Sequence, residues 1–424
     1  MQTISNPPRY QWDALCVRNI PDDSAIEKSV EEIIDNVRQN GDAALLEYAR
    51  KFDHFNGSSL VLSDEEISAA AEKVSPEVAD AIRKAAANIE AFHKAQLPQP
   101  VEVETVPGVR CLQRAVPIER VGLYIPGGRA PLFSTVLMLA IPARIAECRE
   151  VILCTPENGE SGIAPEILFA AKLCGIHKVI RVGGAQAIAA MAFGTDSVPA
   201  VHKIFGPGNR FVTKAKQIVS RTTAIDMPAG PSEVMVLADD TANPTFVAAD
   251  MLSQAEHGPD SQAIAVCNSE ELAEKIRAEV DRLADTLPRR DSIEGSLSHS
   301  RIIVLPKVTD MIAFANNYAP EHLILSVDRP WERAAEITAA GSVFIGNFSP
   351  ESAGDYASGT NHTLPTSAWA RSFSGVNIDS FMHKITYQEL THEGLHRLAD
   401  VITTMAHAEG LDAHALAVTV RQNG

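Results

Sequence analysis

A glutamine and a histidine stand three positions apart in the segment LSQAEHGPDSQ, residues 252–262. Asn243 and Pro244 predict the start of a helix before it, because asparagine caps a helix and proline suits its first position. Gln254 and His257 then lie on one face of the last turn, about 60° apart. The histidine either stabilises the helix end through its charge or supplies, with the glutamine carbonyl, half of a metal site. This segment alone leaves both interpretations open.

A carboxylate and an imidazole are adjacent at Glu321 and His322, in the segment NNYAPEHLILSV. The pattern predicts a helix over 309–316 and a strand over 323–327, which places the pair at the entrance of the strand. Two proton acceptors of different strength in one place suit more than one proton transfer. The alternative interpretation is an exposed turn without a chemical role.

Two further histidines and an aspartate lie in segments that are unusual for connecting loops. Residues 346–377 follow the last predicted strand, have almost no periodic apolar pattern, and contain Asp355 and His362. A long loop inside a compact domain is usually functional. His414 falls in the first turn of a predicted helix capped by Asp412, where the helix dipole favours the neutral imidazole that a metal binds.

Glycine-rich turns follow two of the predicted strands. Residues 183–186 read GGAQ and residues 206–209 read GPGN, and each segment opens a helix. Such turns let backbone N–H groups approach an anion at a helix N-terminus. Neither segment is the GxGxxG fingerprint of dinucleotide-binding proteins. Each turn alone is therefore weak evidence for a nucleotide.

The composition narrows the class of protein. The chain has 424 residues, 45% of them apolar, and a net charge of −17. This length predicts two or more domains, and the charge argues against nucleic-acid or anionic-membrane partners. We expect a soluble cytoplasmic protein, because no apolar run nears about 18 residues and no signal peptide opens the chain. The six cysteines show no CxxC pairs, and Cys154, which ends an apolar run, is expected to be buried and inert.

Helical and α/β patterns divide the chain. The first part is helical: one helix ends at Gly41, Ser63 and Glu66 form a capping box, and another helix begins at Pro76. From residue 121 short buried strands alternate with helices, which predicts parallel sheets covered on both faces. The strands exceed one compact unit, so we expect two, with a seam near 230–233. They are VGLYI, VILCT, KVIRVG, KIFG, TAIDM, EVMVLAD, AIAVC, RIIVL, LILSV and SVFIG.

The end of the chain is expected to be helical after Phe381. Its apolar residues form a narrow stripe that is too small for a core of its own, so this tail must dock on another surface. The stripe consists of Leu395, Leu398, Ile402 and Met405.

Five long segments together resemble the histidinol dehydrogenase family, the enzymes of the last two steps of histidine biosynthesis. They are AIDMPAGPSEVMVLAD, LSQAEHGPDSQ, NNYAPEHL, GDYASGTNHTLPT and AEGLDAHALAV. The resemblance covers essentially the whole chain. It implies a zinc- and NAD-dependent oxidation of L-histidinol, through the aldehyde, to L-histidine, with two NAD molecules consumed.

The resemblance also assigns roles to individual residues. It implies that His322 takes the proton of the alcohol and that Glu321 activates water in the second oxidation. The zinc ligands, which together with His322 also contact the substrate, would be Gln254, His257, Asp355 and His414. Further substrate contacts would be Ser232, His362 and Glu409, and the NAD contacts Tyr124, Gln186 and Asn209. Two nitrogen and two oxygen ligands without thiolate differ from the cysteine-rich set of many structural zinc sites.

The expected fold is α/β, with two Rossmann-like parallel-sheet domains, a helical N-terminal segment and a small helical tail. The expected division is an arm (1–17), a discontinuous domain with the metal and catalytic residues (18–123 and 232–376), an NAD-binding domain (124–231) and the tail (377–424). The resemblance implies that the tail docks on the partner of a homodimer. His414 and Glu409 would then complete the partner's active site.

Two other functions remain open from the residues alone. One is a zinc hydrolase in which Glu321 activates a metal-bound water. The other is a module that binds a small ligand without catalysis and holds a structural metal. An ordinary zinc alcohol dehydrogenase is disfavoured, because the sequence lacks both GxGxxG and a four-cysteine cluster.

Overall fold

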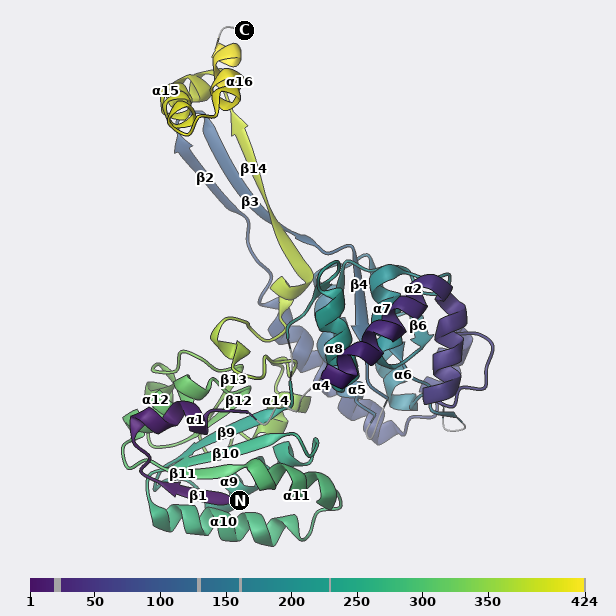
Figure 1. Cartoon of the computed structure of the whole chain (residues 1–424), viewed down its shortest axis with the longest axis vertical. Helices are drawn as coiled ribbons and strands as arrows, with labels where there is room; N and C mark the ends of the chain where they lie inside the picture. Colours follow the sequence, from purple (N-terminus) through teal and green to yellow (C-terminus); the bar gives the residue numbers. More distant parts are fainter. Residues whose placement is uncertain (19–23, 128–130, 160–161, 229, 423–424) are drawn as a thin grey trace.

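Two parallel β-sheets and one antiparallel sheet organise the chain (Figure 1). The computed structural model describes residues 1–18, 24–127, 131–159, 162–228 and 230–422. The antiparallel sheet projects from the two parallel-sheet bodies and carries the last two helices at its far end (Figure 1). The predicted α/β class is confirmed, and each predicted strand of the two bodies is present.

The five-stranded parallel sheet has the order β6-β5-β4-β7-β8. Its strands are β4 (Arg120–Tyr124), β5 (Glu150–Thr155), β6 (Lys178–Arg181), β7 (Lys203–Phe205) and β8 (Ala224–Ile225). The chain runs outward from β4 to one edge and then returns to place β7 on the other side of β4. At such a reversal the loops that follow the two central strands diverge and leave a crevice.

Helices cover this sheet in two layers: inner helices pack on the sheet, and outer helices pack on the inner ones. The inner helices are α5 (Phe133–Ile145), α6 (Pro165–Leu173), α7 (Gly184–Phe193) and α8 (Arg210–Val219). The outer helices are α2 (Ser24–Phe52), α3 (Asp64–Ala71) and α4 (Pro76–Lys94). Helix α2 packs on α7 and α8, α3 on α6, and α4 on α5. The capping box at Ser63 and Glu66 and the Ser75 cap of α4 are confirmed.

The packing of α2, α3 and α4 corrects the predicted division of the chain. The prediction grouped residues 18–123 with 232–376, but the stripe of Val30, Ile34 and Val37 lies in the core of the five-stranded sheet. The reason is that α7 is buried along almost its whole length and α5 along most of it. A helix that is apolar on all sides needs cover on its outer face as well. Helix α2 is also longer than predicted, and only a local break at Gly41 marks the expected end.

The six-stranded parallel sheet has the order β1-β11-β10-β9-β12-β13. Its strands are β1 (Gln2–Ser5), β9 (Glu233–Ala238), β10 (Gln262–Cys267), β11 (Arg301–Val304), β12 (His322–Ser326) and β13 (Ser342–Ile345). The arm predicted at residues 1–17 thus supplies an edge strand, followed by α1 (Trp12–Leu15). Strands β9 and β10 are buried throughout, as expected for a sheet covered on both faces.

Six helices accompany this sheet and set the position of the site. They are α9 (Pro244–Ala255), α10 (Glu270–Ala284), α11 (Arg290–His299), α12 (Val308–Tyr318), α13 (Pro330–Ala334) and α14 (Glu351–Tyr356). Helix α9 begins as predicted, with the Asn243 side chain accepting from the Thr245 N–H and with Pro244 at its first position. Because a crossover helix returns against the strand direction, α9 ends at the edge where β9 and β10 begin.

The antiparallel sheet corrects the prediction for the end of the chain. Strand β14 (Met382–Leu390) pairs along its length with β3 (Val109–Pro117), which also pairs with β2 (Val101–Val106). Residues after Phe381 were predicted to be helical, but helices begin only at α15 (His392–Ala408) and α16 (Asp412–Gln422). Strand β14 is exposed along nearly all of its length, so it lacks the buried alternation that identifies a strand. Its conformation depends on pairing with a distant segment.

The reversal between β4 and β7 depends on Gly206, and a pair of substitutions tests this. Gly206 has φ +125°, and an added Cβ would lie 2.1 Å from the Tyr124 carbonyl oxygen. Gly175 has φ +78°, with no heavy atom of the described chain within 4 Å of an added Cβ. We expect Gly175→Ala to cost about 1–2 kcal/mol from backbone strain alone, and Gly206→Ala to cost about 1–3 kcal/mol more. Urea unfolding measures both, and equal losses would contradict the steric role of Gly206.

Candidate active site

The predicted catalytic pair lies at the amino ends of the two central strands of the six-stranded sheet. His322 begins β12 and pairs with Val234 of β9, and Glu321 directly precedes it. The end of α9 brings Gln254 and His257 to the same edge, and the segment after β13 brings Asp355 and His362. A cavity of about 400 Å³ is lined by all six of these side chains and by Ser232. The structure therefore brings together candidates that are separated widely in the sequence.

The ring of His322 is fixed by the backbone of β9. Its Nδ1 lies 3.1 Å from the carbonyl oxygen of Glu233, and because a carbonyl only accepts, Nδ1 carries the hydrogen. The other nitrogen, Nε2, is buried and has no hydrogen-bond partner among the described residues. Its nearest ionic neighbour is Asp355 Oδ1 at 3.7 Å. His322 thus presents Nε2, the nitrogen through which the ring can exchange a proton, to the cavity.

Glu321 is held by the same residue of β9. Its Oε2 accepts from the backbone N–H of Glu233 at 2.7 Å and lies 3.6 Å from His322 Nδ1. Burial raises the pKa of Glu321 to about 7, although His322 and the Glu233 N–H oppose that rise. A carboxyl group with this pKa can both accept and release a proton near neutral pH.

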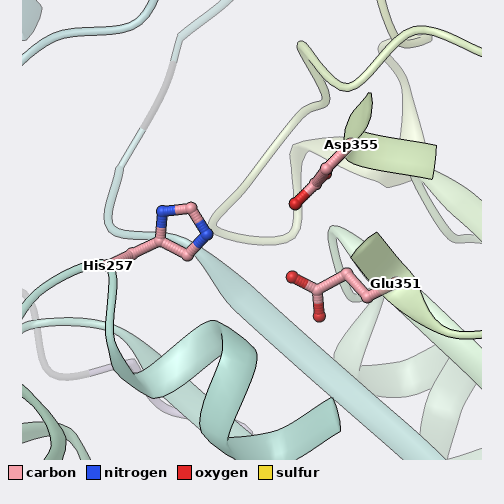
Figure 2. A group of neighbouring side chains, drawn as sticks. All are labelled: His257, Glu351 and Asp355. Carbon is pink, nitrogen blue, oxygen red and sulfur yellow. The ribbon is translucent and has the colours of Figure 1, made fainter. Parts of the chain in front are cut away.

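Three side chains at this edge form a group that can hold a cation. His257, Glu351 and Asp355 each offer a ligand atom, and these atoms lie within 4.8 Å of one another. Figure 2 shows the three side chains directed toward one common space. His257 is exposed, whereas Glu351 is buried. Nitrogen and carboxylate oxygen at this spacing suit a divalent metal such as zinc.

Gln254, the third predicted ligand at this edge of the sheet, is fully buried and lies beside Glu351. When its amide is oriented so that the nitrogen donates to Glu351, the distance to Oε2 is 3.2 Å. The Gln254 carbonyl oxygen is then the atom left to accept from a donor or to bind a cation. Glu351 therefore orients Gln254 as well as belonging to the cation-binding group.

Glu351 was missed by the sequence analysis, which treated residues 346–377 as a loop. In the structure Pro350 precedes the short helix α14, and Glu351 and Asp355 lie one helical turn apart on it. Residues four apart in a helix share a face. The signal was the Ser349-Pro350 pair before Glu351, since proline favours the first turn of a helix.

His362 connects the catalytic edge to the five-stranded sheet. Its Nδ1 donates to the backbone carbonyl of Asp355 at 2.9 Å, and its Nε2 lies 3.2 Å from the hydroxyl of Thr135 in α5. The cavity is lined from both bodies, because Thr135, Pro126 and Asn209 also face it. Reacting groups held by the two bodies can therefore meet there.

A second cavity, of about 600 Å³, lies at the reversal of the five-stranded sheet. Tyr124, Gln186 and Asn209, the three predicted NAD contacts, all line it. The Tyr124 hydroxyl accepts from the Gly184 N–H at 3.1 Å, and Asn209 caps α8 through its side-chain oxygen. Pro126 and Asn209 line both cavities, so the two adjoin. This is the place where open α/β sheets bind nucleotides.

Comparison with known proteins identifies the family. The histidinol dehydrogenase profile matches residues 17–422. A histidinol dehydrogenase of Bacteroides fragilis is 53% identical over 422 residues, 99% of each chain. One of Escherichia coli is 54% identical over 402 residues, 94% of this chain and 92% of the relative. The crystal structure of histidinol dehydrogenase from Elizabethkingia anophelis superposes with a TM-score of 0.97 at 50% identity, over 100% of this chain and 98% of the other.

The chain belongs to the histidinol dehydrogenase family. It is accordingly an oxidoreductase of histidine biosynthesis. None of the helices in the described part of this family member is long and apolar enough to cross a membrane.

Two residues that the family resemblance assigns to the site lie elsewhere in this single chain. Glu409 ends α15 and His414 lies in the first turn of α16, and both are exposed. Helix α16 packs on α15 at the far end of the antiparallel sheet (Figure 1). The residues of one chain thus assemble the predicted site without Glu409 and His414.

Cys154 does not line the candidate active site. It is fully buried in strand β5, and burial raises the pKa of its thiol to about 12. A thiol in that state is neither a nucleophile nor a metal ligand.

Proposed function

We propose that this chain oxidises L-histidinol to L-histidine through L-histidinal, in two successive NAD-dependent steps at one zinc-containing site. The observation that carries the proposal is the state of His322. Its Nδ1 is occupied by a backbone carbonyl, and its buried Nε2 faces Asp355 with no partner among the described residues. An imidazole held in this way is prepared to accept a proton from a substrate in the cavity.

The side chains at the edge of the sheet fit a zinc ion. His257, Asp355 and the Gln254 carbonyl would hold it, with Glu351 orienting Gln254. When bound, zinc supplies a Lewis acid that orients the imidazole and amine of histidinol. The exposed side of His257 leaves room for a further ligand from outside this chain.

The first oxidation removes a proton and a hydride from the alcohol. His322 Nε2 accepts the hydroxyl proton while the adjoining carbon loses its hydride, and the product is the aldehyde. Burial lowers the pKa of His322, but Glu351, Glu321 and Asp355 outweigh that effect and raise it. With a cation bound at Asp355 the pKa of His322 would be lower, which would favour the basic form that the reaction requires.

The second oxidation needs water. Glu321 accepts a proton as water adds to the aldehyde, which gives the monoanion of the hydrate. Loss of hydride from that monoanion gives the carboxylic acid, which ionises to the carboxylate. Because the pKa of Glu321 is raised to about 7, we expect its basic form to be lost as the pH falls below that value. Glu321 and His322 thus act at different stages of one four-electron oxidation.

The cavity at the reversal of the five-stranded sheet would hold NAD. Tyr124, Gln186 and Asn209 would contact it, and the cavity adjoins the catalytic one at Pro126 and Asn209. When bound, NAD accepts the hydride in each oxidation.

The tail is proposed to dock on a second copy of the chain. Besides Met405 of the predicted stripe, several apolar side chains of α15, of α16 and of the turn between them are exposed. They are Val401, Leu411, Leu416 and Val420. In a two-fold dimer each tail can reach the partner, where His414 would become the fourth zinc ligand and Glu409 a substrate contact.

We expect His257→Asn to lose zinc and activity together while the fold survives, because an exposed ligand leaves no cavity in the core. Glu351→Ala should weaken zinc binding about 10–100-fold, since it no longer orients Gln254. Atomic absorption after dialysis against graded chelator measures the metal, and far-UV circular dichroism measures the fold. Glu332→Ala, an exposed carboxylate remote from the site, is the control. Full metal content and normal turnover in His257→Asn would exclude His257 as a ligand.

We expect Glu321→Gln and His322→Gln to fail at different steps, because an amide cannot accept the proton that each base takes. Histidinol and the pre-formed aldehyde are supplied separately, with and without NAD, and NADH formation is measured. Glu321→Gln should be impaired more on the aldehyde, and His322→Gln more on the alcohol. Equal loss of both steps would refute this division. Turnover that does not require NAD would indicate a hydrolase, and tight binding without turnover a binding module.

We expect two inactive variants, His257→Asn and His414→Asn, to restore activity when they are unfolded, mixed and refolded together. A mixed dimer then holds one doubly altered site and one intact site. Random pairing should return about one quarter of the wild-type activity. Mass spectrometry shows whether mixed dimers form. If they form and no activity returns, each tail serves its own chain and the shared site is wrong.

A further inference from the structure

Both members of the catalytic pair are held by the backbone of one residue, Glu233. Its N–H donates to Glu321 Oε2 at 2.7 Å, and its carbonyl accepts from His322 Nδ1 at 3.1 Å. Glu233 is the first residue of β9, next to β12 in the sheet. A displacement of Glu233 would therefore change the direction of both bases.

The side chain of Glu233 is itself fixed by a buried arginine from the start of the chain. Arg18 Nε lies 3.0 Å from Oε1, and Arg18 Nη2 lies 3.0 Å from Oε2. The side chains of Arg18 and Glu233 are only 10% and 2% exposed. Oε1 also accepts from the Ser367 N–H at 2.7 Å. This paired geometry leaves the carboxylate little freedom to rotate.

The same guanidinium holds the turn that carries the catalytic pair. Arg18 Nη2 donates to the Tyr318 carbonyl at 2.6 Å, and the guanidinium lies 3.6 Å from the centre of the Tyr318 ring. Tyr318 ends α12, and Ala319 and Pro320 lead from it to Glu321. Arg18 thus links the start of β9, which orients the bases, to the turn that supplies them.

We propose that Arg18 is a positioning residue for the oxidation chemistry, acting through Glu233 and the turn after Tyr318. The inference rests on the proposed function of Glu321 and His322 as bases. Burying an ion pair is costly and a well-packed apolar pair can be as stable, so stability alone does not account for it. The arginine adds a planar guanidinium group, whose several N–H donors hydrogen-bond to two segments of the chain at once.

The test compares Arg18→Lys and Arg18→Gln with the wild type. Lysine keeps the positive charge but lacks the planar guanidinium with its paired N–H donors. Glutamine lacks both the charge and the guanidinium. Arg9→Gln is the matched control, because Arg9 also joins the start of the chain to α12, through an exposed ion pair with Asp310. We measure five quantities for each protein. They are kcat per folded site, KM for histidinol, zinc content, the melting temperature, and the isotope effect with carbon-deuterated histidinol.

We expect kcat to fall about 10–100-fold in both Arg18 variants, as for other residues that orient an active-site group through a second residue. KM and zinc content should change little, and the isotope effect should be at least as large as in the wild type, because the chemical step is the one that is slowed. Arg9→Gln should match the wild type in every measurement. If Arg18→Gln does not fold, Arg18→Lys decides the question.

Two results would overturn the inference. One is a lower melting temperature in the Arg18 variants with unchanged kcat and isotope effect, and the other is full kcat in Arg18→Lys. Both leave the proposed function intact, because the oxidation of histidinol by the wild type with NAD is measured independently of the Arg18 variants. A wild type that does not oxidise histidinol with NAD would end the proposed function and this inference with it.

Discussion

The register between β9 and β12 is the constraint on which the site depends. Parallel pairing sets His322 opposite Val234, so that the backbone of Glu233 meets both Glu321 and His322. Side chains alternate between the two faces of a strand, so a slip by one residue would turn His322 away from the cavity. The strands that fix this register are fully buried, and their packing therefore determines the direction of the two candidate bases.

The two parallel sheets place their candidate functional residues at opposite ends of their strands. In the five-stranded sheet the candidate NAD residues follow the carboxyl ends of β4, β6 and β7, where the strand order reverses. In the six-stranded sheet the candidate catalytic residues lie at the amino ends of β9 and β12, where α9 ends. The adjoining cavities bring these two edges together. A cofactor bound in the usual position can in this way face bases held at the less usual edge of another sheet.

The antiparallel sheet holds the tail apart from the two parallel-sheet bodies (Figure 1). The bodies need rigid cover, and the inner helices α5 and α7 obtain it from α4 and α2. Three paired strands carry the tail away from the bodies and keep its direction fixed (Figure 1). Exposed apolar side chains on α15 and α16 are what a surface for a second copy requires. The shared site itself remains a prediction.

The sequence by itself determined the local structure and the chemistry of the candidates. Caps such as Asn243, the buried strands, and the adjacency of Glu321 and His322 follow from interactions within a few residues, and long motifs identified the family. Only the tertiary structure decided which distant segments meet. The pairing of β14 with β3, the docking of α2 on α7, the place of Glu351 beside Gln254, and the link from Arg18 to Glu233 have no local signal. The physical reason is that packing and strand pairing join residues hundreds of positions apart, and their free energy depends on the whole fold.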